Sequence, residues 1–322
     1  MPGSARGLVL GYLLDLCLGD PRRNHPVALF GAAALAAERR MYADARGRGA
    51  LHWAACVAVP VGVVAVGTRA LRLVLPAPDA SARRGGLRVL GTAVVAWAVV
   101  GQRSLVREGG ALADALEQER IDDARRQLPA LCGRDPSVLD RAALARAGVE
   151  SLAENTSDAV VAPLLCGALF GVPGLVGYRA VNTLDAMVGN RSQRHANFGW
   201  AAARADDLAN LLPARLTAML TCLAAPLVGG RSADAWRTWR RDGHRHPSPN
   251  AGHCEAAAAG ALGVRLGGPV TYPSGTEVRP VLGDGPPAVP GDVRRAARLS
   301  AAVGALALVA SAGLATVLGR QR

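Results

Sequence analysis

Five long apolar segments interrupt this polar, Arg-rich chain and constrain its fold more than any other feature. They are Leu51–Thr68, Leu87–Gly101, Ala159–Tyr178, Leu208–Val228 and Leu299–Leu318. A helix needs about 20 apolar residues to cross the hydrocarbon core of a bilayer. We therefore expect an all-α, polytopic integral membrane protein with about three to five transmembrane helices, plus re-entrant or amphipathic helices. We expect one membrane domain over residues 1–322.

Two of these segments are imperfect as simple spans. The third contains Pro163 and Pro173, and the fourth contains Pro213 and Arg215. Polar or broken backbone at membrane depth is tolerated where it lines a cavity or is buried in protein. We expect residues 159–178 and 208–228 to be re-entrant or protein-buried.

All 37 basic residues are Arg, and the formal net charge is +12. Without Lys, neither a pyridoxal phosphate Schiff base nor a P-loop phosphate site can form. The Arg residues form no basic stripe, which argues against nucleic acid and leaves anionic lipid or an anionic substrate as partners.

The distribution of Arg predicts the orientation in the membrane. If all five segments span, one side carries 25 Arg and the other carries 10. The positive-inside rule makes the richer side cytoplasmic. If residues 159–178 and 208–228 do not span, residues 179–207 also lie on that side. We expect a multi-pass protein of the cytoplasmic (inner) cell membrane, with its active site on the cytoplasmic face.

Polar motifs gather beside the apolar segments. They are Gly19-Asp20-Pro21 with His25-Pro26-Val27, Glu150–Asp158, Tyr178–Asp185, Phe198-Gly199-Trp200 with Arg204–Asn210, and His246–Gly252. Ionisable groups near membrane depth are expensive and usually belong to a site.

Helical spacing groups several of these side chains. Glu150, Glu154 and Asp158 are four residues apart and share one helix face. Carboxylates of this kind can hold Mg²⁺, which favours oxygen ligands and bridges to phosphate. The same face could instead be a solvated surface, and Arg–Asp sets could be structural ion pairs. The spacing of the neighbouring histidines fits no standard metal site.

Arg side chains on the adjoining motifs fit phosphate recognition. Arg179, Asn182 and Asp185 share one face, as do Arg204, Asp207 and Asn210. Guanidinium groups, including those of Arg191 and Arg215, can bind phosphate by paired hydrogen bonds.

Together and in this order, the motifs resemble those of the CbiB/CobD family of membrane proteins, the adenosylcobinamide-phosphate synthases. The similarity runs from about Leu8 to Leu299 and is densest over Val149–Arg215. The resemblance implies that adenosylcobyric acid is joined to (R)-1-amino-2-propanol O-2-phosphate by an amide bond. It also implies ATP as co-substrate, Mg²⁺ as cofactor, and contact with lipid and other corrinoid-pathway enzymes.

In this reaction we expect three kinds of site residue. The catalytic residues would be Glu154, Asp158, His25 and His246, with the histidines as candidate proton acceptors. Metal would be held by Asp185, Asp206 and Asp207. Substrate would be bound by Asn155, Arg179, Asn182, Arg191, Arg204 and Asn250.

The sequence departs from the family pattern at Asn190, Gln193, His195 and Asn197, which puts the choice of amine substrate in doubt. Two alternatives stay open at this point. One is a corrinoid-binding scaffold or transporter without catalysis, and the other is a membrane prenyltransferase.

Overall fold

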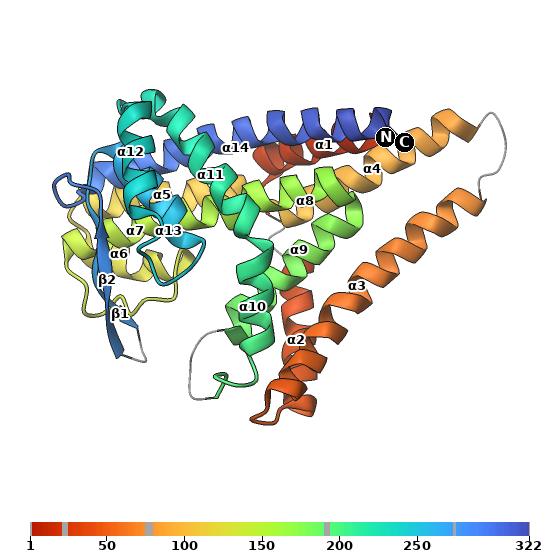
Figure 1. Cartoon of the computed structure of the whole chain (residues 1–322), viewed down its shortest axis with the longest axis horizontal. Helices are drawn as coiled ribbons and strands as arrows, with labels where there is room; N and C mark the ends of the chain where they lie inside the picture. Colours follow the sequence, from red (N-terminus) through yellow and green to blue (C-terminus); the bar gives the residue numbers. More distant parts are fainter. Residues whose placement is uncertain (1, 21–24, 75–79, 190–193, 273–274, 322) are drawn as a thin grey trace. The chain divides into compact units, whose positions relative to one another are not determined.

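The computed structural model describes residues 2–20, 25–74, 80–189, 194–272 and 275–321, and its regular structure is mostly helical (Figure 1). Four segments are long and apolar enough to cross a membrane: Arg46–Ala70, Gly85–Glu117, Leu211–Val228 and Pro290–Arg320. Each overlaps one predicted apolar segment. The prediction of an all-α polytopic membrane protein is confirmed.

The remaining predicted segment, Ala159–Tyr178, forms no continuous helix of spanning length. It is divided into a π-helical turn η2 (Ser157–Val161), α8 (Ala162–Phe170) and α9 (Val172–Leu184). Gly171 separates the two helices with a φ of 68°, a conformation that glycine adopts readily. This break agrees with the expectation that the segment bends.

The chain folds into two compact units, and each is assembled from separate stretches of sequence. Unit 1 comprises residues 1–101, 162–209 and 308–322, and unit 2 comprises residues 102–161 and 210–307. The segment Leu211–Val228 belongs to unit 2, and over half of it is buried in protein.

Unit 1 is helical throughout its described part. Besides α8 and α9 it contains α1 (Pro2–Leu18), α2 (Pro26–Met41), α3 (Arg46–Val74), α4 (Ala80–Val99), the π-helical turn η3 (Asp185–Gly189) and α10 (Trp200–Ala209). Helices α1 and α4 pack side by side (Figure 1). Their backbones approach so closely that a Cβ at Gly11 would lie 2.5 Å from the Cβ of Ala96. Small residues allow this packing between membrane helices.

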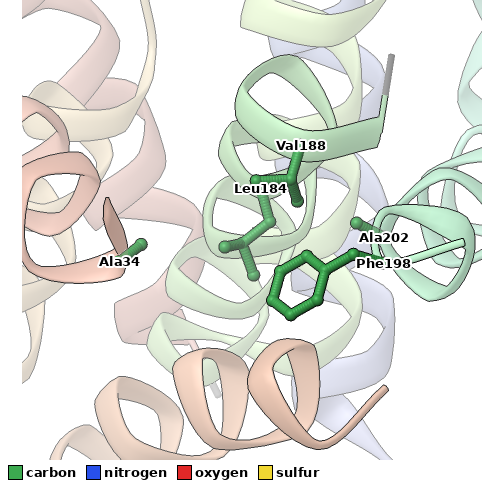
Figure 2. Packing of buried hydrophobic residues seen from close by; sticks show 5 residues of the cluster. All are labelled: Ala34, Leu184, Val188, Phe198 and Ala202. Carbon is green, nitrogen blue, oxygen red and sulfur yellow. The ribbon is translucent and has the colours of Figure 1, made fainter. Parts of the chain in front are cut away.

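A hydrophobic cluster joins the polar motifs of unit 1. Figure 2 shows Phe198 beside Leu184 and Val188, with Ala34 and Ala202 completing the buried group. The residues come from α2, α9, η3, α10 and the loop before α10. The Phe198 ring also lies tilted against the ring of His52, whose Nε2 is hydrogen-bonded to the carbonyl oxygen of Ala34 at 3.0 Å. This packing fixes α9 and α10, which carry the expected phosphate and metal residues.

Unit 2 is built around α13 (Ala251–Leu262), whose residues are nearly all buried. The other elements are α5 (Gln102–Glu117), α6 (Ile121–Gln127), η1 (Leu128–Ala130), α7 (Arg141–Thr156), α11 (Leu211–Ala224), η4 (Ala225–Val228) and α12 (Ser232–Asp242). The first part of α14 (Pro290–Arg320) also belongs to unit 2.

Unit 2 also contains a β-hairpin that the sequence reading did not predict. Strands β1 (Leu266–Tyr272) and β2 (Gly275–Leu282) pair antiparallel, with an irregularity between Leu266 and Gly268. This hairpin is a small β element within an otherwise helical fold. Strand β1 contains Gly267, Gly268 and Pro269, residue types that are depleted in strands. The sequence therefore shows no alternation of apolar and polar residues that would predict the strand.

Candidate active site

The expected site residues fall into two groups, one in each unit. His25, Arg179, Asn182, Asp185, Arg204, Asp206 and Asp207 lie in unit 1. Glu154, Asn155, Asp158, His246 and Asn250 lie in unit 2. Arg191 lies outside the described residues.

Helix α7 contributes one member of a buried ion pair, Glu150, to unit 2. The Glu150 side chain is 1% exposed, which rules out the solvated-surface reading for this residue. One carboxylate oxygen accepts a hydrogen bond from Arg134, and the other accepts one from the Gly267 backbone N–H at 2.6 Å. Burial alone would lower the pKa of Arg134, but the charge and hydrogen bond of Glu150, together with the fields of Cys132 and Glu255, outweigh this and raise it. Both carboxylate oxygens of Glu150 therefore accept hydrogen bonds within the protein, and its role is structural.

Glu154 and Asp158 lie one and two turns further along the chain. Both act electrostatically on the thiol of Cys254 in α13, so the two carboxylates face the same helix. The Glu154 side chain is accessible to solvent. The dense protein around it nevertheless disfavours the charged carboxylate and so raises its pKa. An accessible group within dense protein is well placed to meet a ligand.

The two amide side chains of this group make hydrogen bonds within the protein. Asn155 donates to the carbonyl oxygen of Leu131 at 2.8 Å. Asn250 accepts a hydrogen bond from Arg215 at 3.3 Å. Their expected substrate roles stay predictions.

His246 is buried, and its ring orientation can be deduced. The Ser248 backbone N–H donates to Nδ1 at 3.0 Å, so the neutral ring carries its hydrogen on Nε2. Burial, reinforced by the positive charge of Arg279, lowers the His246 pKa to about 4. At neutral pH the side chain is therefore uncharged and presents an N–H donor.

Sequence reasoning missed three charged members of the unit 2 group: Arg134, Arg279 and Glu255. Glu255 on α13 is 1% exposed and lies within the fields of Glu150 and Glu154. A single acidic residue within the Ala-rich run 251–262 is a signal that could have identified it. Arg134 and Arg279 carry no comparable signal, because they lie in a loop and in the unpredicted hairpin.

In unit 1, His25 begins α2 and caps its N-terminus. Nδ1 accepts a hydrogen bond from the Val27 N–H at 3.1 Å, which leaves the hydrogen on Nε2, 3.9 Å from Asp20. Burial lowers the His25 pKa, the nearby Asp20 opposes this, and Arg179 lowers it further. The structure thus brings together two separate motifs, those of His25 and Arg179.

The acidic residues of η3 and α10 lie against neighbouring groups of unit 1. Asp206 accepts a hydrogen bond from Asn182 at 3.3 Å, and Asp207 pairs with Arg204 at 3.0 Å. The carboxylate of Asp185 lies over Gly189, where a Cβ would meet it at 1.9 Å. The Asn182–Asp206 hydrogen bond brings the two helical motifs together.

Within the described ranges, no three His, Cys, Asp or Glu side chains lie close enough together to hold a metal ion. The expected metal ligands Asp185, Asp206 and Asp207 therefore form no complete protein cage. Mg²⁺ often takes only one or two carboxylates and completes its shell with water and substrate phosphate. The assignment of these three residues stays a prediction.

Comparison with known proteins identifies the family. The family model described as "CobD/Cbib protein" matches residues 8–300. The chain belongs to the CobD/Cbib family. It is 51% identical to the cobalamin biosynthesis protein CobD of Mycobacterium tuberculosis over 305 residues, which cover 95% of this chain and 94% of the relative.

Other members of the CobD/Cbib family are similar over most of their length. The protein of the same name from Geobacter metallireducens is 43% identical over 281 residues, 86% of each chain. That of Rhodobacter capsulatus is 41% identical over 318 residues, 97% of this chain and 95% of the relative. No solved structure matches.

Proposed function

We propose that this CobD/Cbib-family protein serves cobalamin biosynthesis by forming an amide bond. It joins adenosylcobyric acid to (R)-1-amino-2-propanol O-2-phosphate and yields adenosylcobinamide phosphate, with ATP as co-substrate and Mg²⁺ as cofactor. The observation that carries the proposal is the family match over residues 8–300, which spans all the polar motifs. The relatives are named cobalamin biosynthesis proteins, which supports this pathway.

The two groups of side chains suit different parts of such a reaction. In unit 1, Arg179 and Arg204 supply guanidinium groups suited to a phosphate. In unit 2, Glu154 and Asp158 supply carboxylates suited to an amine. Holding two substrates in reacting geometry contributes a large part of the rate of an amide-forming step.

ATP supplies the activation of the carboxylic acid, and Mg²⁺ offsets charge on its phosphates when bound. Since the described side chains form no complete metal cage, we assign no step to a protein-held ion. The residues of this chain then have two tasks: binding phosphate, and binding and orienting the amine.

A reconstituted reaction analysed by mass spectrometry tests the proposal. Purified protein in detergent receives adenosylcobyric acid, the amine phosphate, ATP and Mg²⁺. We expect adenosylcobinamide phosphate to form only when all components are present. Folded protein that binds the corrinoid and yields no product would overturn the proposal in favour of a scaffold or transporter.

The orientation in the cytoplasmic membrane has its own test. Single cysteines are placed at the exposed positions 194 and 196 in a variant lacking the six native cysteines, and intact cells are treated with an impermeant thiol reagent. We expect protection in intact cells and labelling after the membrane is opened. Labelling in intact cells would contradict an active site on the cytoplasmic face.

A further inference from the structure

The carboxylate of Glu255 is buried without a hydrogen-bond partner on either oxygen. The side chain is 1% exposed, and the nearest cationic atoms to Oε1 are Nη1 of Arg279 at 3.8 Å and Nε2 of His246 at 3.9 Å. A buried charge without hydrogen bonds is strongly unfavourable, so buried polar groups almost always have partners. A group left unsatisfied in this way indicates a missing ligand or a bound proton.

His246 presents a second unsatisfied atom to the same place. Its Nε2 is buried and has no hydrogen-bond partner. Since Nδ1 accepts from Ser248, Nε2 carries the hydrogen and is a donor. The acceptors in this part of unit 2 are therefore the carboxylates, and His246 can orient Glu255 without accepting a proton itself.

The balance of charge shows what this cluster lacks. Glu150, Glu154 and Glu255 face Arg134 and Arg279, which leaves one negative charge if every group is ionised. Burial and the two neighbouring carboxylates raise the pKa of Glu255, and burial also raises the pKa of Glu154. Asp158, which acts on the adjacent Cys254, adds further negative charge. A bound cation or a proton restores the balance.

An organic ammonium group fits this cluster better than a metal ion. Glu150 already has both oxygens occupied, and no three potential metal ligands lie together in the described part of the chain. An ammonium group brings three N–H donors of its own, which suit two unsatisfied carboxylate oxygens. Glu154 is exposed, so a ligand can reach the cluster from the surface.

We infer that Glu255 and Glu154 form the binding site for the primary ammonium group of the amine substrate, with a proton taking its place when the site is empty. Glu154 is the accessible carboxylate, Glu255 is the buried one, and His246 positions Glu255. This assignment rests on the proposed function for the identity of the amine. It adds Glu255 and His246 as residues that select a charged amine over a neutral analogue.

The test measures binding and does not depend on turnover. Purified protein in detergent is titrated with (R)-1-amino-2-propanol O-2-phosphate by calorimetry, in two buffers with different ionisation enthalpies. The N-acetylated compound, which keeps the phosphate and lacks the ammonium group, is the second probe. We expect the amine to bind at least tenfold more tightly and to release protons, with release declining as the pH rises.

Glu255→Gln removes the charge and keeps the shape of the side chain. We expect at least a tenfold loss of amine affinity, loss of proton release and unchanged binding of the N-acetyl compound. Glu119→Gln, at an exposed position of the same unit, is the matched control and should bind as the wild type does. Because Glu255→Gln removes a buried acid, this variant should unfold at the same temperature as the wild type or at a higher one. If it does not fold, Glu154→Gln, at the accessible position, should show the same changes.

Equal affinity and equal proton release in the wild type and both variants would overturn the inference. So would wild-type protein that binds the amine and the N-acetyl compound equally. Failure of the proposed function looks different: the wild type would bind the amine through Glu255 and yet form no amide product.

Discussion

One Arg–carboxylate pair in unit 1 and one in unit 2 differ sharply in their burial. In unit 1, Arg204 and Asp207 pair along one helix at the surface, and the Arg204 side chain is 59% exposed. In unit 2, Arg134 and Glu150 pair across different elements, and both side chains are almost completely buried. Exposed pairs contribute little to stability, whereas breaking a buried pair leaves a charge without solvent or partner. The Arg204–Asp207 pair is thus available to a ligand, whereas the Arg134–Glu150 pair maintains the fold.

The largest expected effect comes from breaking the buried pair. Arg134→Ala leaves Glu150 buried with only the Gly267 N–H as partner. We expect unit 2 to lose about 4–5 kcal/mol of stability, near the top of the range for buried ion pairs. Thermal unfolding in detergent should show a fall of roughly ten degrees or more.

Arg141→Ala is the matched control for this change. Arg141 pairs with Glu119 in the same unit, but both side chains are exposed. We expect a loss of less than about 1 kcal/mol. Equal losses in the two variants would remove the distinction between buried and exposed pairs.

The second prediction concerns the apolar support of unit 1. Phe198→Ala deletes the largest side chain of the cluster that joins α2, α9 and α10. A buried Phe replaced by Ala leaves a cavity, and we expect a loss of about 3–4 kcal/mol. Phe170→Ala, at a position 67% exposed in the same unit, should change the unfolding temperature far less. A similar shift for both would show that the cluster does not support unit 1.

The contrast between the units also explains what the sequence could predict. Apolar length located four of the segments that could span, and three-residue spacing placed Arg204 and Asp207 on one helix face, where they pair, since both are local properties of a helix. The Glu150–Arg134–Gly267 contacts join a helix, a loop and a hairpin that are distant in sequence. No periodicity encodes such contacts, so Arg134 and Arg279 were missed.

The third prediction uses pH to compare two buried acids of unit 2. Burial alone would raise the pKa of Asp242, but hydrogen bonds from Arg241, the Gly283 N–H and Arg245 lower it to about 2. This depressed pKa stabilises the folded state above the unfolded value, near 4, and the contribution is lost as the pH falls through about 2. The raised pKa of Glu255 has the opposite sign, since its contribution is lost as the pH rises.

Asp242→Asn should therefore lose about 1–2 kcal/mol at neutral pH, because its Arg partners are half exposed and regain water. Unfolding curves at pH 7 and pH 3 should show the difference from the wild type shrinking in acid. Asp234→Asn, at an exposed pair on the same helix, is the control. A difference that stays constant with pH would contradict the assigned pKa.

The smallest expected effect on stability gives the clearest information on function. Arg204→Ala removes only an exposed pair, so we expect a loss of less than about 1 kcal/mol and an unchanged unfolding temperature. If the Arg204 guanidinium binds a phosphate of ATP, the KM for ATP should rise about tenfold or more, because a charge-assisted hydrogen bond contributes roughly 1.5–3 kcal/mol. Arg46→Ala, at an Arg that lies over the exposed Trp200 ring in the same unit, tests for a general effect of lost charge. Equal KM values for the Arg204→Ala variant and the wild type would show that the exposed charges of unit 1 do not bind the phosphate.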